Sequence, residues 1–258
     1  MNVDLMHGDC LELMKNIPDK SVDMVLCDLP YGTTSKNKWD SIIPFEPLWG
    51  GYNRIVKDNG AILLFGQPPF SSCLVVSNIK NFRYEWIWKK SLAQGFLNAN
   101  KMPLRATENI SVFYRKLPIY NPQKVKGQPY NKGIRKANCT TNYGDFGETS
   151  GINKTGDRYP VNLITGSNGN HKHIFHPTQK PVPLLEYLIK TYTNEGETVL
   201  DNAAGSMSTV IACINTNRNC IAIEKDEHYF SVGCKRVHDH IAKERIDKAD
   251  EDTRKRDE

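Results

Sequence analysis

The fold class of this chain follows from one stretch, Val199-Leu200-Asp201-Asn202-Ala203-Ala204-Gly205-Ser206-Met207-Ser208-Thr209. It predicts a buried strand, a turn of small residues and the start of a helix. Small residues let backbone N–H groups approach a ligand closely at a helix N-terminus. A second strand, residues 220–224, ends in an acid about 20 residues beyond the turn, the spacing expected for a carboxylate that binds ribose hydroxyls. These elements predict a nucleoside site in an α/β fold, although an ordinary βαβ unit whose acid caps a helix shares the pattern.

A second informative stretch is Asp28-Leu29-Pro30-Tyr31-Gly32, which directly follows the apolar run Val22–Cys27. The run predicts a buried strand, and ligands of open α/β sheets bind outside the carboxyl ends of strands. A carboxylate and a backbone carbonyl can accept hydrogen bonds from an amino group while an aromatic ring stacks on a flat substrate. An Asp-x-Pro turn is also common in loops, so the stretch becomes specific only together with the predicted nucleoside site.

Together these residues resemble the amino-methylating DNA methyltransferases, in the permuted (beta) group whose catalytic motif precedes the cofactor motif. Asp28-Leu29-Pro30-Tyr31 is similar to the family's Asp-Pro-Pro-Tyr catalytic motif. Residues 201–209 are similar to its Asp-Pro-Phe-x-Gly-Ser-Gly-Thr-Thr motif for S-adenosylmethionine. Residues 175–181, before a helical run at 184–189, match the element that precedes the cofactor motif, and residues 8–13 resemble the segment that closes over the adenine. The resemblance covers most of residues 1–235.

The resemblance implies a Rossmann-like methyltransferase fold, a mixed, mostly parallel sheet with helices on both faces, plus an irregular target-recognition insertion. It also implies site roles, with no metal. The implied catalytic residues are Asp28, Leu29, Pro30 and Tyr31. The implied cofactor residues are Asp9 and Cys10 at the adenine edge, Glu224 at the ribose, and Asp201, Asn202, Ala203, Gly205 and Ser206 at the methionine end, assisted by Lys180.

Two residues depart from the family motifs. Leu29 replaces the first proline of the catalytic motif, which should matter little because the expected contact uses the backbone carbonyl. Met207 replaces the second glycine of the cofactor turn, where a side chain would clash if positive φ or close approach were required. We expect Met207 to pack outward, away from the ligand, so that cofactor binding survives.

The implied function is methyl transfer from S-adenosylmethionine to the exocyclic N6 of a flipped adenine in double-stranded DNA. The lone pair of an exocyclic amine is conjugated with the base, so hydrogen bonds to Asp28 and to the Leu29 carbonyl should free it for in-line attack. Tyr31 should stack on the flipped base. A cytosine-carbon methyltransferase would need a nucleophilic cysteine in a Pro-Cys turn, and the sequence contains none.

Three alternatives stay open. Cytosine-N4 methylation uses the same chemistry, but those relatives more often begin the catalytic motif with Ser. Protein-glutamine and RNA methyltransferases usually begin it with Asn. A catalytically impaired DNA-binding remnant is kept open by Met207 and opposed by the intact Asp28 and Tyr31.

Length and composition predict one methyltransferase domain over residues 1–258, with a target-recognition insertion at about 116–172 and a charged tail at about 241–258. Strand candidates before the insertion are residues 22–27, 61–65, 84–88 and 109–114. The insertion is rich in turn residues and carries lysines and arginines between tyrosines, which suits contacts to phosphates and base edges. A solvated surface insertion is the alternative. Residues 91–103 are expected to border the target pocket.

The remaining features predict a cytoplasmic enzyme. The net charge is a modest +5, the seven cysteines lack paired short spacings, and the first residues do not resemble a secretory leader. His171, His173 and His176 invite a metal interpretation, which we reject because no acidic or cysteine partner stands at a plausible spacing. The expected partner is double-stranded DNA; a homodimer and a cognate restriction endonuclease stay open.

Overall fold

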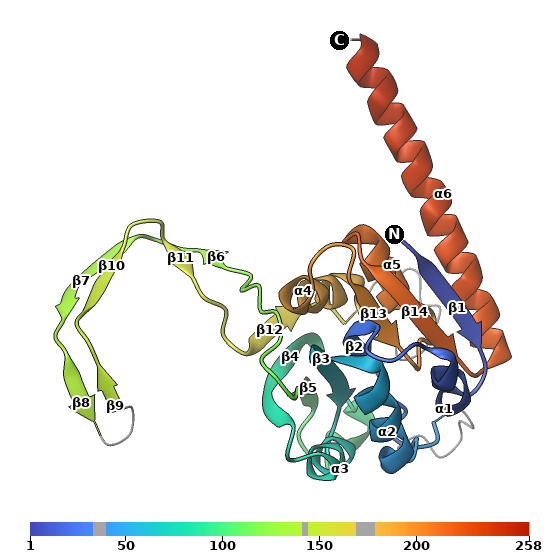
Figure 1. Cartoon of the computed structure of the whole chain (residues 1–258), viewed down its shortest axis with the longest axis horizontal. Helices are drawn as coiled ribbons and strands as arrows, with labels where there is room; N and C mark the ends of the chain where they lie inside the picture. The colour runs from blue at the N-terminus through green and yellow to red at the C-terminus, as the bar shows by residue number, and fades with distance from the viewer. Residues whose placement is uncertain (33–39, 141–143, 169–178, 258) are drawn as a thin grey trace. The chain divides into compact units, whose positions relative to one another are not determined.

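The computed structural model describes residues 1–32, 40–140, 144–168 and 179–257 (Figure 1). They form two compact units, Met1–Asn121 with Asn162–Glu258, and Pro122–Val161. The three histidines considered as metal ligands, and residues 175–178 of the element before the cofactor motif, lie outside the described residues. Within the described ranges, no helix combines the length and the apolar character that a membrane span requires.

In its described part, the larger unit contains an eight-stranded sheet with the order β1-β14-β13-β2-β3-β5-β4-β12. All neighbours in this order are parallel except β3–β5 and β5–β4, so the sheet is mixed and mostly parallel, as predicted. The strands are β1 (Val3–His7), β2 (Val22–Cys27), β3 (Val56–Gly66), β4 (Phe82–Gln94), β5 (Arg105–Phe113), β12 (Leu163–Gly166), β13 (Thr198–Asp201) and β14 (Asn219–Glu224).

Helices cover both faces of this sheet (Figure 1). Side chains alternate between the faces of a strand, and β2 shows the result. Met24 and Leu26 pack with α4, α5 and α6, while Val25 and Cys27 pack with α1, α2 and α3. Burial on both faces explains why β2 is an almost continuous apolar run. The helical elements are α1 (Cys10–Leu13), η1 (Met14–Asn16), α2 (Phe45–Ile55), α3 (Phe70–Ser77), η2 (Phe96–Asn98), α4 (Val182–Tyr192), α5 (Ser208–Asn215) and α6 (Glu227–Asp257).

The pairing of β2 with β13 brings the two predicted motifs together. Val25 of β2 lies opposite Leu200 of β13 in a parallel register. Asp28 therefore follows one strand at the same sheet edge where Asp201 ends its neighbour. At the C-terminus, the helix α6 extends through most of the run in which the sequence suggests a charged tail.

The smaller unit is a two-stranded ribbon made of three successive antiparallel pairs. These are β6 (Val125–Lys126) with β11 (Asp157–Arg158), β7 (Tyr130–Arg135) with β10 (Thr149–Asn153), and β8 (Asn138–Thr140) with β9 (Gly144–Phe146). Every residue of β7 is exposed. A strand exposed on both faces has no apolar alternation, which is why the sequence predicts no strand here. Residues 163–166, expected within the insertion, instead form β12 of the main sheet.

Candidate active site

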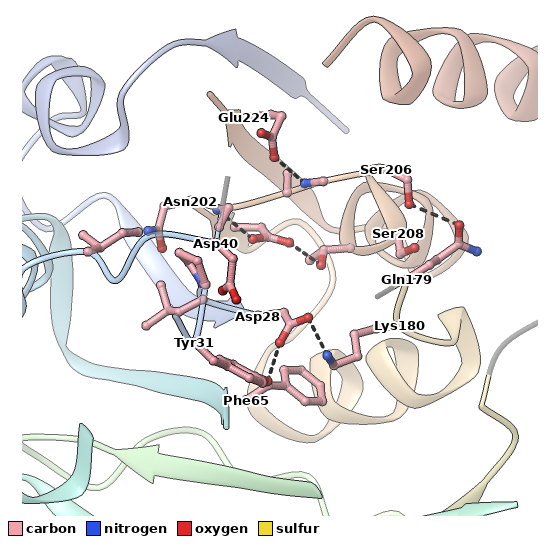
Figure 2. A pocket seen from close by; sticks show the side chains of 18 of the residues that line it. Asp28, Tyr31, Asp40, Phe65, Gln179, Lys180, Asn202, Ser206, Ser208 and Glu224 are labelled. Atoms are coloured by element: carbon pink, nitrogen blue, oxygen red, sulfur yellow. Dashed lines mark hydrogen bonds and ion pairs between the residues drawn. The ribbon is translucent and has the colours of Figure 1, made fainter. Parts of the chain in front are cut away.

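The carboxyl ends of four neighbouring parallel strands, β1, β14, β13 and β2, border a cavity of about 620 Å³ (Figure 2). Ligands of α/β sheets bind at this edge. Each residue that the sequence assigns to catalysis or to cofactor binding lines this cavity: Asp9, Cys10, Asp28, Leu29, Pro30, Tyr31, Lys180, Asp201, Asn202, Ala203, Gly205, Ser206 and Glu224.

Two carboxylates hold the turn between β13 and α5. Asp201 accepts hydrogen bonds from the Ala203 N–H at 3.2 Å and from the Thr209 hydroxyl at 2.6 Å. Glu224 Oε2 accepts one from the Gly205 N–H at 2.7 Å. Burial raises the pKa of Asp201 to about 6 and also raises the pKa of Glu224. The turn is therefore tied to its own helix and to the end of β14, which preorganises it.

This turn retains groups that fit a nucleoside. Each Glu224 oxygen accepts one backbone N–H, since Oε1 binds that of Asp226 at 2.7 Å, and a second lone pair on each oxygen can accept a ribose hydroxyl. The buried Nδ2 of Asn202 has no hydrogen-bond partner among the described residues, whereas its Oδ1 accepts the Tyr52 hydroxyl. An unpaired buried donor is costly, and an acceptor on a bound ligand would satisfy it.

The residues predicted for the adenine edge follow β1. Asp9 Oδ1 accepts a hydrogen bond from the Leu11 N–H at 2.9 Å and so caps α1. Its Oδ2 pairs with Lys225 at 3.0 Å, and the hydrogen bond from Lys225 lowers the pKa of Asp9. Cys10 is buried, and burial raises the pKa of its thiol. These contacts fix the backbone of this segment beside the cavity.

The expectation that Met207 packs outward, away from the ligand, is correct only in part. Its side chain is fully buried in the core formed with α4, α5 and α6, so it packs inward rather than outward. It is not among the residues that line the cavity, although Ser206 and Ser208 on either side of it are. The backbone has a φ of 62°, the left-handed conformation that favours glycine. Gly233 of α6 provides the space, because a Cβ added there would lie 2.4 Å from Met207 Cγ.

On the other side of the cavity, Asp28 is held by two donors (Figure 2). The Tyr31 hydroxyl donates to Asp28 Oδ1 at 2.6 Å, and the Lys180 ammonium pairs with Asp28 Oδ2. The Tyr31 ring stacks on Phe70 with a centroid separation of 4.9 Å and an interplanar angle of 26°. The Asp28 carboxylate is thus oriented by a tyrosine whose own ring is packed in place.

Glu108 and Lys90 complete a buried network that the sequence analysis missed. Glu108 lies 3.0 Å from Lys180 and 2.7 Å from Lys90. Its Oε1 lies 3.0 Å from the Tyr31 hydroxyl, whose single proton it shares with Asp28. The sequence did contain a signal for both residues, because side chains two positions apart on a strand share one face. Lys90 continues the buried face of Trp86 and Trp88, and Glu108 precedes buried Ile110 and Val112 at the same spacing. The residues of this network are Lys90, Glu108, Lys180, Asp28 and Tyr31.

Lys180 was predicted to assist at the methionine end of the cofactor, but its contacts are with the residues around the catalytic motif. Its ammonium pairs with both Asp28 and Glu108. The residue before it, Gln179, instead contacts the cofactor turn, since it accepts a hydrogen bond from the Ser206 hydroxyl at 3.2 Å. Lys180 therefore belongs to the group of residues around the catalytic motif.

The network contains two ammonium and two carboxylate groups, which sets its protonation. Burial acts to raise the pKa of Glu108, but Lys180 and Lys90 outweigh it and lower that pKa to about 2. Burial raises the pKa of Asp28, and Lys180 counteracts it. Burial and both carboxylates raise the pKa of Tyr31 well above its usual value, so its hydroxyl remains a donor.

A cleft with a nucleoside-type turn on one side and an oriented carboxylate on the other defines an α/β enzyme that acts on a nucleotide-like ligand. A family model described as DNA methylase, of the N6/N4 type, matches residues 22–235. The chain belongs to this N6/N4 DNA methylase family.

Individual relatives agree with the family. The DNA adenine methyltransferase YhdJ of Escherichia coli K12 is 27% identical, over 90% of this chain and 82% of its own length. The type II methyltransferase M.BamHI of Bacillus amyloliquefaciens is 26% identical over 85% of this chain, which spans 54% of that relative.

Two solved structures share the fold. The M1.HpyAVI complex with SAM has a TM-score of 0.63 and 25% identity, covering 91% of this chain and 98% of that one. The cytosine-N4-specific PvuII DNA methyltransferase has a TM-score of 0.64 at 17% identity, covering 93% of this chain and 91% of that one.

Proposed function

We propose that this chain transfers a methyl group from S-adenosylmethionine to the exocyclic N6 of adenine in double-stranded DNA. The observation that carries the proposal is the cavity in which the Asp28 motif at the end of β2 faces the turn at the end of β13. S-adenosylmethionine is the methyl donor of this family and, when bound, supplies an electrophilic methyl group on sulfur. Glu224 would hold its ribose, and Asn202 with the 203–206 turn would hold its methionine end.

Asp28 would bind the amino group of the target base. Tyr31 and Lys180 each occupy one site on a different Asp28 oxygen, and each oxygen has a further lone pair for an N–H of the amine. The Leu29 carbonyl would accept the second N–H. Hydrogen bonds from both protons turn the nitrogen lone pair out of conjugation and aim it at the methyl group.

Methyl transfer exchanges one bond to the methyl carbon for another. A nitrogen–carbon bond forms, the carbon–sulfur bond breaks, and sulfur keeps the electron pair. The methylated nitrogen then loses one proton, which Asp28, the carboxylate that would bind this amine, would take and release to solvent. Its pKa is raised by burial, which suits a transient proton acceptor.

Two observations favour adenine. The catalytic motif begins with Asp, and the relative YhdJ is named an adenine methyltransferase. Cytosine-N4 is the second candidate, because the PvuII enzyme with that specificity shares the fold.

The smaller unit is proposed to contact the DNA target. Its basic side chains lie over tyrosine rings, with Lys124 4.7 Å from the Tyr159 centroid and Arg158 4.6 Å from that of Tyr130. Lys124 is exposed and Arg158 is half-buried, and exposed cations such as Lys124 suit phosphate contacts. A homodimer and a cognate endonuclease stay predictions.

The test is methyl transfer from labelled S-adenosylmethionine to unmethylated genomic DNA, with mass spectrometry of the released nucleosides. N6-methyladenine is the expected product. N4-methylcytosine would keep the mechanism and overturn the choice of base. Bound cofactor without labelled DNA would favour RNA or protein amides, and an absence of cofactor binding would indicate an impaired remnant.

A further inference from the structure

Residues 91–104, which we call the rim loop, carry five large apolar side chains in solvent. They are Leu92, Phe96, Leu97, Met102 and Leu104. Phe96 is 76% exposed and Leu97 is 84% exposed, on the short η2 turn. A folded chain rarely leaves so many large apolar side chains exposed together unless they meet a partner.

The rim loop adjoins the cavity. Gln94 within the loop and Arg105 directly after it both line the cavity and are partners in the β4–β5 register. Gln94 accepts a hydrogen bond at 2.8 Å from Lys90, which pairs with Glu108. Whatever the rim loop contacts therefore lies next to the mouth of the candidate active site.

The backbone of the rim loop is shaped by its own hydrogen bonds. The Asn98 N–H donates to the Gly95 carbonyl at 2.9 Å, and the Lys101 N–H donates to the Asn98 carbonyl at 2.8 Å. Gly95 has a φ of 91°, which lets the chain turn into η2. This hydrogen-bonded turn keeps the side chains of Phe96 and Leu97 exposed to solvent.

The rim loop and the residues that flank it are basic. Lys89, Lys101 and Arg105 are exposed, and the sequence has no acidic residue from 89 to 107. A basic segment with apolar side chains at its centre is complementary to a nucleic acid, whose phosphates flank an apolar base stack. It is therefore better suited to DNA than to an apolar protein surface.

We propose that the rim loop docks on duplex DNA at the target site and that Phe96 and Leu97 insert into the base stack. This inference rests on the proposed function, because the base must leave the stack to reach Asp28. Flipping leaves a gap beside the partner strand, and apolar side chains can fill such a gap and keep the duplex open. The rim loop would then favour the flipped state rather than take part in the chemical step.

The experiment compares two duplexes that differ only at the target base. One contains the site identified from genomic methylation, and the other places a mismatched base opposite the target, which lowers the cost of flipping. The variants are Phe96→Ala/Leu97→Ala and the single Leu97→Ala. The control is Val76→Ala/Ile79→Ala, which removes two exposed apolar side chains that do not line the cavity.

On the paired duplex, the double variant should lose roughly tenfold or more in kcat/KM, the scale of one lost stacking contact. On the mismatched duplex it should come within about threefold of the wild type, because the gap-filling role is less needed there. The control should match the wild type on both, and cofactor affinity should be unchanged in every variant, which also verifies folding.

A second readout is the fluorescence of 2-aminopurine placed at the target position, which rises when the base unstacks. Wild-type protein should raise it, and the double variant should raise it less. Equal loss of kcat/KM on both duplexes, or no loss on either, would overturn the role of the rim loop. Failure of the wild type to methylate either duplex would instead overturn the proposed function.

Discussion

Lys90 Nζ lies 2.7 Å from Glu108 Oε2, and both side chains are almost completely buried, with 4% and 3% exposed. The same glutamate also pairs with Lys180 at 3.0 Å, so Glu108 contacts both ammonium groups, and Asp28 supplies the second negative charge through Lys180. Buried charges are tolerated only when they are paired. Glu108 is therefore the residue on which the electrostatic balance of the candidate site depends.

Replacing Glu108 by Gln should lower the free energy of unfolding by about 3 kcal/mol at neutral pH, because buried Lys90 would lose its carboxylate partner and Lys180 would keep only Asp28. The folded pKa of Glu108, about 2, lies below its ordinary 4.5. Its stabilisation is therefore fully present above about pH 4.5 and is lost as the pH falls toward 2. Urea unfolding from about pH 7 down to about pH 3 should show the gap between wild type and variant narrowing.

The matched control is Glu12→Gln, which removes an exposed carboxylate paired with Lys15. It should change stability by less than about 0.5 kcal/mol. A wild-type-like E108Q, or a stability gap that stays constant with pH, would contradict this account of the network.

Asp28→Asn should reduce methyl transfer by roughly a hundredfold or more, because the amide cannot accept the proton and offers one acceptor oxygen instead of two. Cofactor affinity should be retained, since Asp28 lies across the cavity from the turn. Calorimetry with S-adenosylmethionine and single-turnover assays separate the two effects. Asp58→Asn, at a surface carboxylate paired with Lys20 and Lys116, should leave both unchanged. Full turnover by D28N would exclude the assigned role.

Gly233→Ala should destabilise the protein by about 1–3 kcal/mol, because the new methyl group would overlap Met207. Met207→Ala should also destabilise it, by about 2–5 kcal/mol, since it opens a cavity in the core. In the double variant the added methyl group has space, so its cost should largely disappear. Thermal unfolding of the four proteins gives this coupling, and strictly additive losses would show that the two residues do not share the space.

Lys132→Gln/Lys154→Gln, at two exposed lysines of the ribbon, should weaken DNA binding and reduce the salt dependence of the binding constant by up to about 2 in slope. Cofactor affinity should not change. Fluorescence anisotropy with a labelled duplex at several salt concentrations measures the slope. The charge-matched control on the larger unit is Lys15→Gln/Lys243→Gln. An unchanged slope in the ribbon variant would contradict a contact between the ribbon and DNA.

The sequence carried enough information for the strands that are buried on both faces. The apolar run that predicts residues 22–27 coincides with β2, and the two motifs predict strand ends that the sheet places side by side. Local patterns suffice here because a strand buried on both sides must be apolar throughout. The ribbon escaped prediction for the converse reason, since β7 is exposed along its whole length and no buried face imposes an apolar pattern on it.

What the sequence determined by itself is the class of fold, the order of the motifs and the residues that gather at one sheet edge. Only the tertiary structure decided the partners of the buried charges. The antiparallel register of β4 and β5 brings Lys90 to Glu108, and the packing of the chain before α4 brings Lys180 to both carboxylates. Likewise, Met207 is accommodated by Gly233 of a different helix. Such pairings join residues far apart in the chain, so they depend on sheet order and helix packing rather than on any local pattern.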